Sequence, residues 1–98
     1  MDVNILIWIQ EWYTSQCDGE WEHEYGITIN TVDNPGWYIT IDLAFTKLEN
    51  VELDVGTIEN GESDWYFYAI KNKQYKASGD SSKLEFLLLK FKEVAENY

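Results

Sequence analysis

The sequence predicts an α+β fold: an antiparallel sheet of four or five strands, flanked by an N-terminal and a C-terminal helix packed on one face. Three observations predict it. Apolar residues recur at helical spacing near both ends of the chain, apolar and polar residues alternate between those ends, and turn-forming sequences separate the alternating runs. The 98 residues are enough to bury a real core, and we expect one domain, residues 1–98.

The first predicted element is an amphipathic helix over residues 4–15. Ile5, Trp8, Ile9 and Trp12 share one helical face, with polar residues opposite. The helix is expected to end near "CDG", since Asp and Gly favour a turn and a helix exit.

A hairpin is predicted next, from residues 20–30 and 37–43. Both stretches alternate apolar and polar residues, and "DNPG" between them is a turn sequence in which Pro35 presets φ and Gly36 tolerates a positive φ. One face of the first predicted strand carries Trp21, His23, Tyr25, Ile27 and Ile29, and we expect this face to point toward the core.

The remaining strands come from "NVELDVGTIEN", "DWYFYAI" and "YKASG", with a bulge expected at Gly56. Ser82 and Glu85 form a capping-box pattern before a second amphipathic helix. We predict that both helices cover one face of an antiparallel meander. The expected shared core contains Trp8, Trp12, Ile39, Ile41, Leu87, Leu88 and Phe91.

Charge narrows the classes of function. The formal net charge is −11, and residues 1–70 hold fourteen carboxylates against Lys47 alone. Such a surface disfavours nucleic acid, whose affinity comes mostly from cations on phosphates, and favours a basic protein partner. The single Cys17 suits a reducing cytosol. We expect no signal peptide, because the first residues lack a basic region and a cleavage site, and no membrane-spanning segment, because the apolar run is too short.

The stretch "CDGEWEHEY" brings together a thiol, an imidazole and four carboxylates. Zinc is usually held by two or more Cys or His ligands that come from well-separated pairs. The whole chain has one cysteine, Cys17, and one histidine, His23. Carboxylates around Cys17 would disfavour its thiolate, which is the wrong direction for a nucleophile. We therefore expect no metal, no cofactor and no enzymatic activity. A small hydrolase that uses the carboxylate cluster is the least favoured of the functions considered.

The carboxylates of this stretch are the predicted partner-binding residues. Glu20, Glu22 and Glu24 would lie on one strand face about 7 Å apart, where they repel each other. That repulsion lowers the stability of a monomer. The same charges suit a surface that binds a cationic partner. Asp18 extends the acidic cluster, and Tyr38 on a solvent-side face is a candidate anchor, since interface energy concentrates in Tyr and Trp.

The residues also resemble a known family. "WIQEWYTSQCDGEWEHEYGITINTVDNPGWYITIDL", together with the later "ESDW" and "ASGD", is similar to the bacterial immunity protein 53 family. The resemblance covers most of the chain and is most specific in the first 43 residues.

The resemblance implies a cytoplasmic protein that neutralises a toxin of a polymorphic toxin system, encoded beside it. It names no mechanism. Combined with the charge, it predicts an immunity protein whose acidic surface occupies the basic active site of a nuclease-like toxin. The alternative is an acidic cytosolic adaptor or regulatory module. The identity of the toxin and the oligomeric state stay open.

Overall fold

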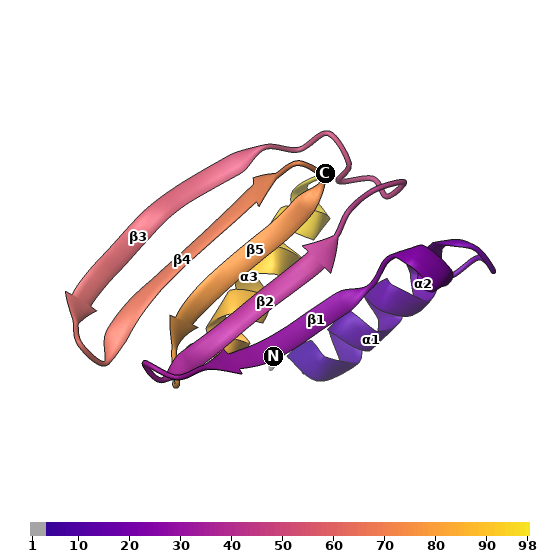
Figure 1. Ribbon diagram of the computed structural model, residues 1–98. Helices are drawn as coiled ribbons and strands as arrows, with labels where there is room; N and C mark the ends of the chain where they lie inside the picture. The colour runs from indigo at the N-terminus through magenta and orange to yellow at the C-terminus, as the bar shows by residue number, and fades with distance from the viewer. Residues whose placement is uncertain (1–3) are drawn as a thin grey trace.

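The computed structural model describes residues 4–98 as one sheet with helices near both ends of the chain (Figure 1). The elements are α1 (Ile5–Gln16), α2 (Trp21–Glu24), β1 (Ile27–Val32), β2 (Gly36–Asp42), β3 (Leu53–Gly61), β4 (Asp64–Lys71), β5 (Gln74–Asp80) and α3 (Leu84–Asn97). The predicted α+β class, with an antiparallel sheet between two terminal helices, is confirmed. No helix within these residues is long and apolar enough to span a bilayer.

The five strands are ordered β1-β2-β5-β4-β3, and every neighbouring pair is antiparallel. The predicted simple meander is therefore wrong in one respect, because β2 lies beside β5 and not beside β3. Residues 43–52 carry the chain from the end of β2 to the far edge strand, and two hairpins then return it to β2 (Figure 1). This order places the apolar strands β2 and β5 next to each other inside the sheet.

The strand details follow from local sequence. Asn72 and Lys73 both adopt a positive φ between β4 and β5, as a two-residue hairpin turn requires. The predicted bulge is confirmed, since the β3–β4 register shifts between Val55 and Ile58, around Gly56.

One face of the sheet and the two long helices enclose the core. Ile39 and Ile41 of β2 are fully buried and belong to one cluster with Leu87, Leu88 and Phe91 of α3. Ile5 and Ile9 of α1 belong to the same cluster, whereas Trp8 and Trp12 are partly buried and pack their rings edge-on against Phe91, with centroids 5.9 and 5.0 Å away. The predicted core and the packing of both helices on one sheet face are confirmed.

Two local predictions are wrong. Residues 21–24 form the short helix α2, not the start of a strand, and β1 begins only at Ile27. The capping box is also absent: helix α3 starts after Lys83 without a side-chain cap, and the Ser82 hydroxyl donates to Asp80 instead, at 2.6 Å. In both places, a nearby carboxylate accepts hydrogen bonds that the sequence pattern did not include.

Candidate functional site

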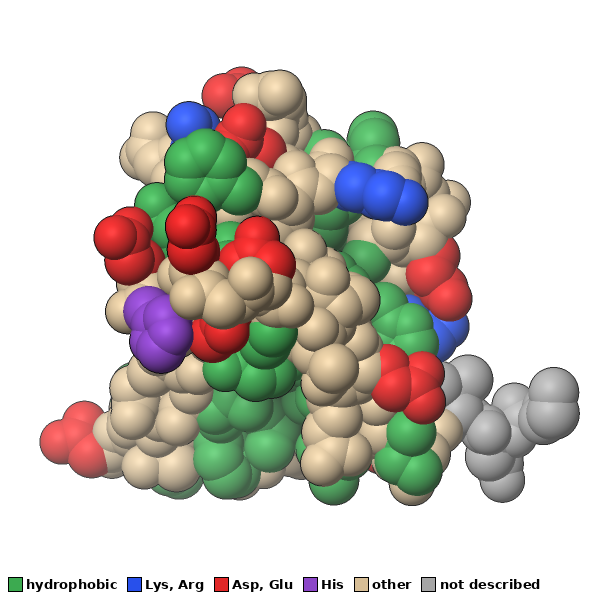
Figure 2. Space-filling view, turned by 90° about the vertical axis from the view of Figure 1, so that its right-hand side faces the viewer, with side chains coloured by type: hydrophobic (Ala, Val, Ile, Leu, Met, Phe, Trp, Pro, Cys, Tyr) green, Lys and Arg blue, Asp and Glu red, His purple; other side chains and the backbone are tan. Residues whose placement is uncertain are grey.

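The candidate site is a shallow hollow between α2 and the loop that follows β2. Its lining comes from the turn of residues 18–20, from Trp21, His23 and Glu24 of α2, and from Tyr25 and Phe45. On this side of the molecule several carboxylates gather around the histidine side chain, next to hydrophobic surface (Figure 2). The hollow is therefore an open surface feature that combines negative charge with aromatic rings.

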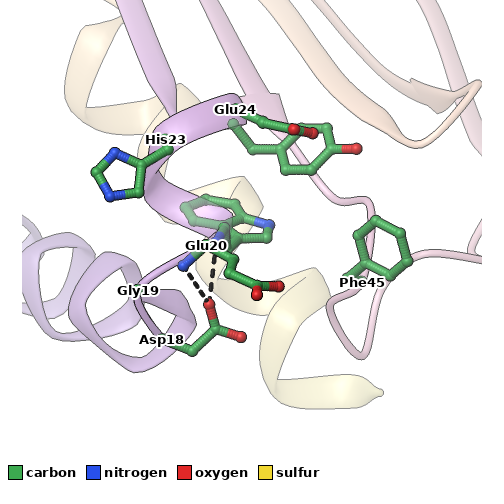
Figure 3. A pocket seen from close by; sticks show the side chains of 8 residues that line it. Asp18, Gly19, Glu20, His23, Glu24 and Phe45 are labelled. Atoms are coloured by element: carbon green, nitrogen blue, oxygen red, sulfur yellow. Dashed lines mark hydrogen bonds between the residues drawn. The ribbon is translucent and has the colours of Figure 1, made fainter.

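The turn before α2 is fixed by two carboxylates that bond to backbone amides. Asp18 Oδ1 accepts hydrogen bonds from the N–H groups of Glu20 and Trp21, both at 2.9 Å, which fixes the turn that leads into the helix (Figure 3). The Glu22 carboxylate reaches back and accepts from the N–H groups of Asp18 at 3.0 Å and Gly19 at 2.9 Å. These bonds explain why the alternating sequence turns into a helix here.

The same bonds keep both groups ionised. The Trp21 amide, followed by that of Glu20, lowers the pKa of the Asp18 carboxyl below its usual value. The pKa of the Glu22 carboxyl is lowered by its own backbone amide and by those of Asp18 and Gly19. Asp18 and Glu22 therefore support the local fold, and their charges are already engaged.

Trp21 fastens α2 to the rest of the molecule. Its side chain is buried, and its indole N–H donates to the carbonyl oxygen of Ala44 at 2.9 Å. The ring also contacts Trp12 and Tyr25, with centroids 6.2 and 6.0 Å away, and Tyr25 in turn contacts Phe45 at 6.0 Å. A chain of aromatic rings thus runs from the core to the hollow.

Glu20 and Glu24 are the carboxylates left facing solvent. Their side chains extend toward the side of α2 on which Phe45 lies, whereas His23 projects from the other side (Figure 3). Five of the seven lysines form ion pairs with other carboxylates, and no ion pair within residues 4–98 includes Glu20 or Glu24. Negative charge at the hollow is therefore not compensated by a direct cationic contact from the described chain.

The structure brings together some of the predicted partner-binding residues. Asp18, Glu20 and Glu24 line the hollow, while Glu22 bonds to the turn behind it. Tyr38 lies elsewhere, on β2 between Asn30 and Ser78, on the sheet face turned away from the helices.

Two expectations about this stretch need correction. The predicted stripe of three glutamates along a strand does not form, because these residues lie in or just before α2. His23 was expected on the core side, but it is exposed on that helix. Trp21 is buried as expected.

Phe45 is the residue that sequence reasoning missed. Residues 44–50 fit no helical or strand periodicity, so the sequence pattern predicts neither an element nor a role for them. A single aromatic residue in such a stretch, between Ala44 and Thr46, is the signal that could have drawn attention to it.

The chemistry of the hollow suits binding. The Cys17 thiol donates to the carbonyl oxygen of Tyr13 at 3.3 Å, closing the end of α1. Within residues 4–98, no three His, Cys, Asp or Glu side chains gather in a way that could hold a metal ion. The arrangement places carboxylates and an aromatic ring together at one exposed hollow.

The structure has an α+β fold, and its candidate site is an exposed surface and not an enclosed cavity. The family model described as immunity protein 53 matches residues 6–96, so the chain belongs to the immunity protein 53 family. No curated protein and no solved structure matches the chain.

Proposed function

We propose that this protein neutralises a bacterial toxin by covering a basic active site with the acidic surface around α2. Membership of the immunity protein 53 family supports an immunity function and a toxin partner in general. The observation that carries the finer proposal is the pair of exposed carboxylates, Glu20 and Glu24, at a hollow to which the described chain brings no cation by ion pairing.

A nuclease is the class of toxin that fits this surface best. Its active site must be basic to hold phosphates, so a cluster of carboxylates can occupy the same place as a charge mimic. Complementary charge would also speed the encounter, which matters to a protein that must stop a toxin inside its own cell. In this proposal the protein works in the cytoplasm, binds neither nucleic acid nor membrane, and catalyses nothing.

The second candidate function is an acidic adaptor with no toxin partner. The same surface would then recruit another basic cytosolic protein. Tyr38 and the rest of the uncovered sheet face would be the natural place for additional contacts, because interfaces favour tyrosine. Co-expression and pull-down with the toxin encoded beside this chain separates the two functions.

The site is tested by reversing its charge. The double variant Glu20→Lys with Glu24→Lys removes both exposed carboxylates and leaves the Asp18 and Glu22 bonds intact. The matched control is Glu59→Lys with Glu62→Lys, which changes the net charge equally at a separate hollow lined by Asn34, Thr57 and Trp65. Association with an inactive variant of the neighbouring toxin is measured by stopped flow at several salt concentrations.

The α2 variant should lose at least about tenfold in association rate at low salt, and the difference should shrink as salt screens the charge. The control should lose much less. Equal losses would show that only net charge matters, and an unchanged α2 variant would place the interface elsewhere.

A further inference from the structure

Phe45 is an exposed aromatic side chain in a position that the fold alone does not require. It is 80% exposed, the highest value among the large hydrophobic residues of the described chain. Its ring contacts Tyr25 at a centroid distance of 6.0 Å and otherwise faces water. Burial therefore gives this side chain little stabilisation.

The backbone at Phe45 is also unfavourable for this residue type. Its φ of 63° lies in the left-handed region, which Gly and Asn adopt far more easily than a bulky aromatic residue. The fold tolerates an exposed ring on a left-handed backbone at this position, but neither feature stabilises the protein. Asparagine at this position would suit the isolated protein better.

The surrounding loop nevertheless holds Phe45 firmly. The Glu49 carboxylate accepts a hydrogen bond from the Phe45 N–H at 2.6 Å, and the Thr46 hydroxyl donates to the carbonyl oxygen of Leu43 at 2.7 Å. The neighbouring carbonyl of Ala44 accepts from the buried Trp21 indole. The ring is thus presented from a preorganised loop, which reduces the entropy lost on binding.

The charge around Phe45 indicates the chemistry of a partner surface that could bind its ring. Glu20 and Glu24 lie at the same hollow as Phe45, and in Figure 3 their side chains extend toward its side. A partner that buries the ring must also face these carboxylates. Its complement is an apolar socket bordered by lysine or arginine, and such buried aromatic anchors carry most of the energy of an interface.

We propose that Phe45 is the anchor with which this protein docks on its toxin, inserting into an apolar socket of the toxin that is bordered by cationic side chains. This inference rests on the proposed immunity function. It adds that affinity comes mainly from the ring, whereas Glu20 and Glu24 govern the rate of encounter.

The test is the variant Phe45→Asn, which removes the ring and keeps a residue suited to the left-handed backbone. Binding to the inactive toxin encoded beside this chain is measured by titration calorimetry and by dissociation kinetics. The equilibrium dissociation constant should rise at least about 30-fold, mostly through faster dissociation. The melting temperature of the free protein should stay the same or rise.

The matched control is Tyr98→Asn, which removes a second exposed aromatic ring, 67% exposed at the end of α3, and should leave the dissociation constant unchanged. If wild type binds the toxin but Phe45→Asn binds equally well, the anchor is refuted and the immunity function stands. A lower melting temperature for Phe45→Asn would make the ring structural and would also refute it. Failure of the wild type to bind would overturn the proposed function itself.

Discussion

The two ends of this molecule use carboxylates differently. At the junction of β5 and α3, Asp80 is only 3% exposed and accepts hydrogen bonds from the Trp65 amide, from the amide and hydroxyl of Ser82, and from the Lys83 ammonium. At α2, the Glu20 and Glu24 carboxylates line an open hollow without ion-pair partners among the described residues. One carboxylate joins β4, β5 and α3, and the other two contribute little to the fold.

The difference shows how to sort acidic residues in so acidic a chain. A carboxylate with several internal donors stabilises the protein, and its charge is not available to a partner. A carboxylate without donors adds to the self-repulsion of this acidic chain and stabilises the fold little, so its charge remains available to a partner. Asp18 and Glu22 fall between these extremes, because they sit at the surface but bond to the turn that positions α2.

The largest effect is expected from Asp80→Ala. It leaves the half-buried Lys83 with Asp64 as its one remaining ion-pair partner among residues 4–98, and the Trp65 amide loses its acceptor. The free energy of unfolding should fall by about 3 kcal/mol, as expected when one partner of a buried pair is removed. Urea denaturation measures it. Asp64→Ala, at a far more exposed carboxylate, is the control and should cost less than about 1 kcal/mol.

Acid should weaken the same junction. Burial opposes ionisation of Asp80, but the bonds from Lys83, Ser82 and Trp65 outweigh it and hold the pKa of this carboxyl well below its usual range. Ionised Asp80 therefore stabilises the fold fully above the unfolded-state pKa of about 3.9, and this contribution disappears as pH falls through the folded-state value.

Denaturation midpoints between about pH 5 and pH 2 measure this dependence. The Asp80→Asn variant, which cannot titrate at this position, should show a flatter decline than wild type. Parallel profiles for the two proteins would exclude Asp80 as a source of the acid sensitivity.

The smallest expected effect is on stability, and it distinguishes Asp18 from Glu20 in the turn before α2. Asp18→Ala removes the acceptor for the Glu20 and Trp21 amides and should lower the denaturation midpoint, though by less than Asp80→Ala. Glu20→Ala should leave the midpoint unchanged, because its side chain has no internal partner in the described structure. If both variants have the same stability, Asp18 does not stabilise the turn before α2.

The sequence alone predicted the fold class because long periodic runs reflect burial directly. The spacing of Leu87, Leu88 and Phe91 and the alternation around Ile39 and Ile41 placed all five residues in one core, and the structure has them there. The family was also within reach, because the stretch over residues 8–43 resembles immunity protein 53, whereas the binding surface near α2 stays a proposal.

What the sequence by itself determined is the buried face of α1, α3 and β2, because a long hydrophobic period along the chain reflects the side on which the core lies. Only the tertiary structure decided that β2 pairs with β5 and that Phe45 stands exposed at the same hollow as Glu20 and Glu24. The physical reason is range. Periodicity is a property of neighbouring residues along the chain, whereas strand order and the neighbours of a loop depend on groups that meet only after folding.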